Sequence, residues 1–310
     1  MKLIKPSYEI WQQPCGLEGV YKQIERAGRV CYKSEDKITE NSAKSFVDRM
    51  IKSGHGAMLE HGTVYLAMPM ETILPIEANG WGKYTKNPYS KGFKVCEVDG
   101  QKRVAVTTNL RVLVENGWLD DLQYICEPTE YHERRVTVHF VCDRGVSHEF
   151  VRHRVFSFAQ ESTRYCNYSK DKFGNELTFI IPEWCPEIRE GSNKGWDPCS
   201  IYDKLYLQHL QNAENTYFAL LKQWDERVPD KRYKSGFKNN PWVPQQARAI
   251  LPNALKTELV MTGFVSDWKH FFSLRSKIAK TGKPHPQAQE LADPLMDEFI
   301  KKGIMETLIK

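Results

Sequence analysis

One run of charged and polar side chains, placed directly after a strand pattern, constrains this chain more than any other feature. Residues 136–141 read VTVHFV, with Val136, Val138 and Phe140 on one face of an alternating pattern. A period of two residues predicts a β-strand. The segment GVSHEFVRHRVFSFAQESTRY follows at 145–165 and contains an Arg-His-Arg triplet. The charged cluster is therefore carried by an element that leaves a strand, which is where anion sites in α/β proteins tend to lie.

The triplet is difficult to accommodate on a regular helix. Residues 142–145 predict a turn, and Ser147 is the expected N-cap of a helix that begins there. On that helix, residues 152, 153 and 154 would point about 100° apart from one another. They could not all face water if Phe150 and its apolar neighbours are buried. Either the helix ends before the triplet, or the charges face ligands or another subunit.

A second group of polar residues favours an anion site. Ser162, Thr163 and Arg164 supply two hydroxyl donors and a guanidinium. This set suits a phosphate, because arginine matches phosphate oxygens with two parallel hydrogen bonds. A solvated basic surface is the simpler interpretation of an isolated Arg-His-Arg triplet, and the hydroxyl and guanidinium groups downstream count against it.

Two further arginines are expected to be partly buried. Arg248 precedes Ile250 and Leu251, and Arg275 follows Phe271, Phe272 and Leu274. A buried guanidinium needs an anion or a carbonyl partner, because an unpaired buried charge costs several kcal/mol. An internal salt bridge and a bound ligand would both meet this requirement.

Composition excludes several classes of protein. The 310 residues are 41% hydrophobic and 27% charged, with a net charge of +5, so the chain can bury a core and is only mildly basic. Its eight cysteines form no C-x-x-C pair, so no metal site is expected. The N-terminus MKLIKPSYEI contains no apolar signal region, and no stretch reaches the roughly 18 apolar residues of a membrane span. We therefore expect a reduced, cytoplasmic protein.

Hydrophobic spacing and turn residues predict the remaining elements. Asp99-Gly100 predicts a hairpin, Thr108 is expected to cap a short helix that ends at Gly117, and Ser42 is expected to cap a helix stopped by Gly54. That second helix should bury Phe46, Met50 and Ile51. The other predicted elements are a helix over 16–34, strands at 63–68 and 178–182, a loop over 183–200, a helix over 201–227, a basic loop over 228–241 and a helical tail over 286–310.

The spacing Arg152-His153-Arg154, seven residues, Ser162, one residue, Arg164 resembles the signature of the flavin-dependent thymidylate synthases. Two other blocks resemble conserved regions of the same family. They are Gly54-His55 with Glu60-His61, and Ala247-Arg248, Leu251-Pro252, Leu274-Arg275, His285, Gln287 and Gln289. Taken alone, His55 and His61 could equally be loop histidines bonded to backbone.

The resemblance implies an α+β fold with an α/β core, a small β-sheet and flanking helices. This is the family's own fold and not a Rossmann fold, and no Gly-x-Gly-x-x-Gly is present. We expect a single domain over 1–310, with insertions at about 69–133 and 183–241. The segment 69–133 is expected to lie over one face without a chemical role.

The resemblance also implies methylation of dUMP to dTMP. Methylene-tetrahydrofolate would donate the carbon, NADPH would be the reductant and FAD would carry the hydride. A homotetramer with shared active sites is implied, without membrane or nucleic-acid partners. In such an assembly, Arg152 and Arg154 could serve ligands on different sides.

By the same resemblance, Arg275 is the catalytic residue, facing the uracil ring. The residues expected to bind dUMP are Glu149, Arg152, Gln160, Glu161, Ser162, Thr163, Arg164, Arg248 and Arg275. The residues expected to bind FAD are His55, Ala57, Glu60, Arg152, His153, Arg154, Gln160 and His270.

Three positions differ from some members of the family. Ala57 stands where a hydroxyl residue occurs, and Phe264 and His270 align with asparagines that contact the flavin. A flavoprotein of this fold with altered activity is therefore one alternative. A nucleic-acid-binding protein is the other, suggested by the basic segments and the 12% aromatic content, although no RNA-binding motif is present.

Overall fold

A computed structural model describes residues 1–73, 83–98, 100–190, 200–222, 241–280 and 282–306. The chain divides into two compact units. Unit 1 comprises 1–6, 142–147 and 161–257, and unit 2 comprises 7–141, 148–160 and 258–310. The single domain expected over 1–310 stays a prediction, and each unit is described by itself.

A four-stranded sheet organises unit 2, in the order β2-β6-β9-β7. The strands are β2 (Ser7–Trp11), β6 (Arg135–Asp143), β9 (Lys256–Phe264) and β7 (Ser157–Gln160). The β2–β6 and β7–β9 pairs are antiparallel. β6 confirms the strand predicted over 136–141, and the last two residues of β6 and the first two of β9 belong to unit 1.

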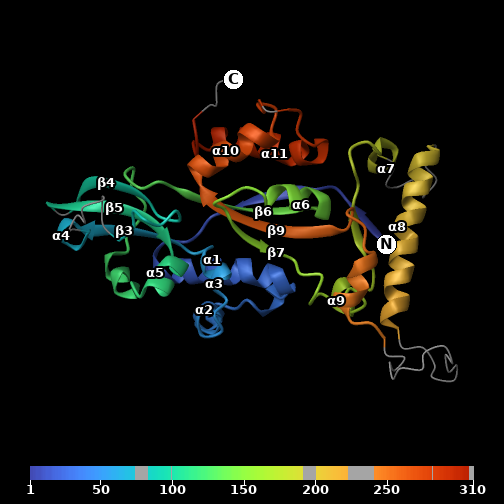
Figure 1. Cartoon of the computed structure of the whole chain (residues 1–310), viewed down its shortest axis with the longest axis horizontal. Coiled ribbons are helices and arrows are strands. Elements are labelled where there is room, and N and C mark those ends of the chain that lie inside the picture. Colours follow the sequence, from blue (N-terminus) through green and yellow to red (C-terminus); the bar gives the residue numbers. More distant parts are fainter. Residues whose placement is uncertain (74–82, 99, 191–199, 223–240, 281, 307–310) are drawn as a thin grey trace. The chain divides into compact units, whose positions relative to one another are not determined.

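Helices cover both faces of this sheet. α1 (Gly16–Tyr32) lies on one side, and α10 (Val265–Arg275) and α11 (Pro286–Lys301) lie on the other (Figure 1). α1 packs Ala27 and Val30 against Ala159 of β7 and Val260 of β9. The helix predicted over 16–34 is therefore confirmed, and Val20, Ile24 and Ala27, which recur at helical spacing, lie on its buried face.

The opposite face of the sheet is packed with aromatic rings. Trp268 of α10 is fully buried, and its indole N–H donates to the carbonyl of Val136 at 3.1 Å. Its ring lies 4.8 Å from that of Phe156, measured between centroids, in the edge-to-face arrangement that aromatic pairs prefer. The other rings in this cluster are Phe140, Phe150, Phe271, Phe272 and Phe299.

A second, three-stranded antiparallel sheet has the order β3-β5-β4. Its strands are β3 (Thr63–Pro69), β5 (Gln101–Asn109) and β4 (Lys91–Val98). The pairing of Val98 with Gln101 confirms the predicted hairpin, and Gly100 supplies a positive φ of 74°. Asp99 lies outside the described residues.

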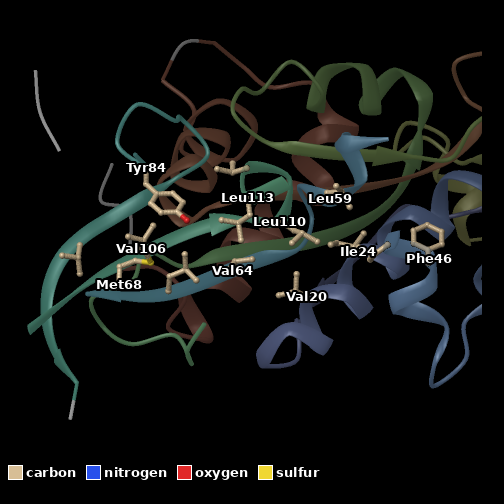
Figure 2. Packing of buried hydrophobic residues seen from close by; sticks show 14 residues of the cluster. Val20, Ile24, Phe46, Leu59, Val64, Met68, Tyr84, Val106, Leu110 and Leu113 are labelled. Carbon is tan, nitrogen blue, oxygen red and sulfur yellow. The ribbon is translucent and has the colours of Figure 1, made fainter. Parts of the chain in front are cut away.

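The segment 69–133 is built into unit 2. It contains α4 (Met70–Ile73), β4, β5, α5 (Leu110–Asn116) and η2 (Leu119–Tyr124). Figure 2 shows Tyr84, Val106 and Leu113 from this segment in one core with Val20 of α1 and Phe46 of α2 (Ser42–Lys52). Each large apolar side chain buried in this way contributes about 1.5–3 kcal/mol, so the segment is an integral part of the core.

Unit 1 contains a small parallel sheet and one long helix. β1 (Lys2–Ile4) pairs with β8 (Thr178–Ile180), and α8 (Ile201–Leu221) packs Leu210 and Tyr217 into a core with Phe179 and Leu255. The loop predicted over 183–200 contains α7 (Pro186–Glu190), so that prediction is wrong in part, because proline is well suited to begin a helix. The end of the helix predicted over 201–227, like most of the basic loop, lies outside the described residues.

The shorter elements complete the described chain. They are η1 (Glu35–Lys37), α3 (Gly56–Leu59), α6 (Arg144–Phe150), η3 (Asp171–Phe173), α9 (Pro244–Ala247) and η4 (Arg248–Ile250). The fold class is α+β, with small sheets and flanking helices as predicted. In the part of the chain that the structure describes, no helix is long and apolar enough to cross a bilayer.

Three predicted helix starts were wrong. Asn109, and not Thr108, caps α5 by accepting from the backbone N–H of Val112 at 3.1 Å, and the helix of Ser42 begins after Asn41. The helix expected to be capped by Ser147 begins instead at Arg144, directly after β6, so the predicted turn over 142–145 is absent. Asp143 accepts from the N–H of Val146 at 2.8 Å at this helix start. Adjacent short polar residues compete for such positions, and sequence alone does not decide between them.

The predicted apolar stripe of α2 was also wrong at one position, because Ile51 is exposed while Phe46 is buried.

The packing of Phe156 on β9 gives a stability prediction. A Cβ on Gly263 would lie 2.5 Å from the Phe156 ring, so Gly263→Ala should lower the free energy of unfolding by about 1–3 kcal/mol through overpacking. Urea unfolding would measure this loss. In a Phe156→Leu background the smaller side chain should relieve most of it, and an equal loss in both backgrounds would contradict the assigned contact.

Candidate functional site

The Arg-His-Arg triplet lies immediately beyond the end of α6 at Phe150. The geometric difficulty is thus resolved by the helix ending before the triplet. Arg152 and Arg154 are exposed, and neither has an ion-pair partner among the described residues, whereas His153 is buried. Two guanidinium groups are therefore directed to solvent around one buried imidazole.

His153 is held as a neutral hydrogen-bond acceptor. Its Nδ1 lies 3.0 Å from the carbonyl oxygen of Phe150, so Nδ1 must carry the proton and donate. Nε2 then carries a lone pair, and it is buried without a partner in the described part of the chain. Burial lowers the pKa of His153 to about 4, so the ring is neutral at pH 7.

Arg275 and Glu149, both predicted site residues, form a salt bridge between Nη1 and Oε2. Nη2 of Arg275 also donates to the carbonyl of Glu149 at 3.1 Å, and Nε is buried without a partner among the residues described. His270 is exposed, and its ring centroid lies 6.4 Å from that of His153. An internal salt bridge, one of the two outcomes expected for a partly buried Arg275, is therefore observed.

The block at 54–61 is less uniform. His55 and Ala57 are exposed, whereas Glu60 is buried and accepts from Nη1 of Arg111. His61 is fully buried, with Nδ1 2.8 Å from Oγ1 of Thr262. Burial lowers the pKa of His61 to about 3. The contact with Thr262 gives this histidine a side-chain partner, which the simpler interpretation of a loop histidine bonded to backbone did not include.

Arg135, which sequence reasoning missed, joins this block to the sheet. Its Nη1 donates to the carbonyl of Glu60 at 2.9 Å and to Oγ1 of Thr63 at 3.3 Å, and its Nη2 donates to Oγ of Ser157 at 3.1 Å. Burial lowers its pKa to about 10, so the guanidinium is charged at pH 7. The available signal was the alternation of β6, which places Arg135 on the same face as Thr137.

In unit 1, Arg164 is exposed beside two polar groups. Its backbone N–H donates to Oγ of Ser162 at 3.2 Å, and its Nε donates to Oε1 of Gln245 at 3.1 Å. An accepting hydroxyl keeps its proton for donation, so Ser162 and the remaining N–H groups of Arg164 can bind an anion. Thr163 is buried, and Gln160 is the last residue of β7 in unit 2.

Glu161 is satisfied by protein groups. It is 2% exposed and accepts from the hydroxyl of Tyr168 at 2.8 Å and from Nζ of Lys256 at 2.8 Å. Any contact with a ligand is thus expected through its backbone. Sequence reasoning missed Lys256 and Tyr168, and no local pattern could have identified Lys256, because it pairs across 95 residues.

The partial burial predicted for Arg248 was wrong. Arg248 is exposed, whereas its neighbour Ala247 is fully buried. The reason is the helical turn η4, which Arg248 begins and which directs successive side chains to different sides. No ion pair of Arg248 is found among the described residues, so its guanidinium is available to an anion.

Phe264 occupies a structural position. Its ring is 2% exposed and lies under Nζ of Lys91 at 4.5 Å, measured to the ring centroid. Lys91 also pairs with Asp267 of α10 at 3.1 Å. Hence Lys91, from the segment 69–133, holds the start of α10 together with this ring.

A known protein family matches more than half of this chain. The profile of the family described as thymidylate synthase complementing protein matches residues 128–302, more than half of the chain. The chain belongs to this family. The matched range includes the signature at 152–164 and Arg248, Arg275 and His270, but the block at 54–61 lies outside it.

Relatives are distant in sequence. A protein of Corynebacterium aurimucosum named flavin-dependent thymidylate synthase is 22% identical over 268 residues, which cover 86% of this chain and 72% of the relative. Proteins of the same name from Thermococcus onnurineus and Pyrococcus abyssi are 33% and 28% identical, each covering 54% of this chain and 55% of the relative. The chain thus matches about half the length of these two.

Among solved structures, the UMP/dUMP methylase PolB from Streptomyces cacaoi, bound with 5-Br dUMP, is similar to this chain. It is 14% identical, with a TM-score of 0.41, over 97% of this chain and 93% of the other.

The two buried histidines predict a pH dependence of stability. Unfolded histidine has a pKa of about 6.5, whereas the folded values for His61 and His153 are about 3 and 4. Between these values the unfolded state binds more protons, so the free energy of unfolding should fall as pH falls from 6.5, by about 1.4 kcal/mol per pH unit for each histidine. Urea unfolding between pH 4.5 and 6.5 would measure this slope.

His61→Asn provides the control, because its amide can still bond Thr262 but does not titrate. The slope should decrease by about one proton. An unchanged slope would show that His61 is not held neutral.

Proposed function

We propose that this protein methylates dUMP to dTMP with a flavin cofactor. The observation that carries the proposal is the complete signature of Arg152, His153, Arg154, Ser162 and Arg164 inside the range matched by the family profile. The relatives named flavin-dependent thymidylate synthase support the same reaction.

We assign FAD to the triplet and the residues that the family motif groups with it. The fit rests on the unpartnered lone pair of His153 Nε2, which can accept a hydrogen bond, and on the exposed guanidinium groups of Arg152 and Arg154, which suit a pyrophosphate. His55, Ala57, Glu60, Gln160 and His270 complete the assigned set. Bound FAD would pass hydride, drawn from NADPH, in a reaction whose carbon comes from methylene-tetrahydrofolate.

The phosphate of dUMP is assigned to Ser162, Arg164 and Arg248. All three can donate, and neither arginine is neutralised by a carboxylate among the described residues. Charge-assisted hydrogen bonds of this kind contribute about 1.5–3 kcal/mol each. Glu161 and Thr163 would contribute backbone donors, because their side chains are buried.

Arg275 is assigned to the uracil ring. Hydride addition to the activated uracil would place negative charge on the ring amide system, which a fixed guanidinium stabilises most strongly when water is excluded. Glu149 accepts from two nitrogens of Arg275, one through its side chain and one through its carbonyl, and so fixes the direction of the guanidinium. Nε of Arg275 remains available to donate.

The assembly and the compartment belong to the same proposal. We infer a homotetramer with shared active sites, no nucleic-acid partner and a reduced, cytoplasmic setting. The seven cysteines within the described residues are all free thiols, in keeping with a reducing compartment.

Substitutions of Arg164 and Arg275 should have different effects on dUMP binding and turnover. Arg164→Ala should weaken dUMP binding roughly tenfold to a hundredfold, because one charge-assisted contact to the phosphate is lost. Arg275→Ala should lower turnover more than it weakens binding. Titration calorimetry with dUMP and steady-state kinetics would separate the two effects. Wild-type affinity in Arg164→Ala, or a larger loss of binding than of turnover in Arg275→Ala, would reverse these roles.

The reaction itself is tested by tritium release. With dUMP labelled at the methyl-acceptor carbon of uracil, release should require FAD, NADPH and methylene-tetrahydrofolate together. Release would remain absent in a flavin-binding protein of altered activity, for which Ala57, Phe264 and His270 are the first positions to exchange. Absence of both release and flavin binding would contradict the proposal and turn attention to nucleic acid.

A further inference from the structure

Unit 2 contains a cavity of about 620 Å³ that none of the signature residues lines. It lies between the end of β2, the start of α1, β3, the start of β6 and the segment after α11. The lining residues on which the inference depends are Pro14, Cys15, Gly16, Tyr65, Arg134, Arg135 and Lys302.

Every charged residue that lines this cavity is a cation. These residues are Arg134, Arg135 and Lys302, of which Lys302 is paired with Glu298 at 3.0 Å, and no carboxylate is among the lining residues. Arg134 is exposed, and no ion pair of its side chain is found in the described ranges. The N-terminus of α1 also opens at the cavity through Gly16, and its N-cap, Cys15, makes no side-chain capping bond. The unsatisfied N–H groups of a 17-residue helix add partial positive charge there.

Arg135 is the strongest indication of a ligand. It is 8% exposed, and its guanidinium donates to the backbone carbonyl of Glu60 and to the hydroxyls of Thr63 and Ser157, all of which are neutral. Its Nε has no hydrogen-bond partner among the described residues. The carboxylates of Glu60 and Asp267 act on Arg135 through their charge, but neither is hydrogen-bonded to it. A buried guanidinium without a hydrogen-bonded counter-charge is costly, and an anion in the cavity would offset that cost.

The walls of the cavity are fixed without a ligand. The side-chain amide of Gln13 both donates to and accepts from the backbone of Thr63, at 2.8 Å each. The backbone of Pro14 lies so close to α1 that a Cβ on Gly19 would be 1.8 Å from its carbonyl oxygen. The Tyr65 hydroxyl accepts from the N–H of Arg135 at 3.3 Å. Such a preformed site loses little conformational entropy on binding.

The size and lining define the class of ligand. A volume of this order is typical of sites for small organic molecules and far exceeds that of an inorganic ion. Apolar walls are supplied by Ile10, Val20, Ile125, Val136 and Ile304. The faces of Trp11 are taken by Arg26 at 3.8 Å and His139 at 5.0 Å, so the indole offers no free face for stacking.

We propose that this cavity binds an organic anion of about nucleotide size. Its phosphate or carboxylate would lie against Arg134, Arg135 and the start of α1, and its apolar body against the aliphatic wall. None of the residues assigned to dUMP or FAD lines this cavity, so the ligand site is an addition to the proposed function.

Binding is tested on the full chain with two probes, ATP for a phosphate and folic acid for a carboxylate, by titration calorimetry. Arg134→Ala should weaken binding of at least one probe tenfold or more, and Arg134→Ala with Lys302→Ala should weaken it further. Lys44→Ala is the matched control, because it removes an exposed cation of α2 outside the cavity. The probe whose binding is weakened in Arg134→Ala shows whether the cavity binds a phosphate or a carboxylate.

A second readout uses the exposed thiol of Cys15. The responding probe should slow the alkylation of Cys15 by iodoacetamide, followed by peptide mass spectrometry, and Arg134→Ala should abolish this protection. Failure of both probes to bind at millimolar concentration would overturn the proposal. So would binding that is lost in Arg164→Ala and kept in Arg134→Ala. Titration of dUMP into Arg134→Ala, expected to be unchanged, separates failure here from failure of the proposed activity.

Discussion

The burial of one cation, Arg135, is the constraint on which the arrangement of unit 2 depends. Its two terminal nitrogens reach the carbonyl of Glu60, the hydroxyl of Thr63 and the hydroxyl of Ser157. These three residues belong to the block at 54–61, to the start of β3 and to the start of β7, which follows the Arg-His-Arg triplet directly. One guanidinium thus fixes the ends of two motif segments that lie far apart in the sequence.

The two faces of the central sheet then have separate roles. On one face, Phe140 packs against Phe150, which ends α6, and against Phe271 of α10. This packing fixes the positions of the two helices that carry Glu149 and Arg275. The salt bridge between these two residues is therefore supported by close-packed aromatic rings. On the other face, Thr137 bonds Thr262, which also bonds His61. Polar groups buried together in this way must be satisfied by one another, and they specify a single packing of the sheet.

Sequence predicted much of this, and its errors have physical causes. The strand over 136–141, the hairpin at Gly100 and the helix from Gly16 follow from periodicity and turn chemistry, which are local. The exposure of Arg248 was missed, because its apolar neighbours Ile250 and Leu251 lie at the end of a helical turn that is only partly buried. The pairing of Glu161 with Lys256 depends on strands brought together by the whole fold. The motif positions were visible in the sequence, but their partners were not.

The contact between Gln13 and Thr63 has a consequence for assembly. β3 is one of the two outer strands of its sheet, and such strands present unpaired backbone groups that can pair with another copy of the chain. Here the Gln13 amide occupies Thr63, the N–H of Cys126 donates to the carbonyl of Tyr65 at 3.0 Å, and Ile125 bridges to Leu66. The edge of β3 from Thr63 to Leu66 is therefore closed to intermolecular β-addition.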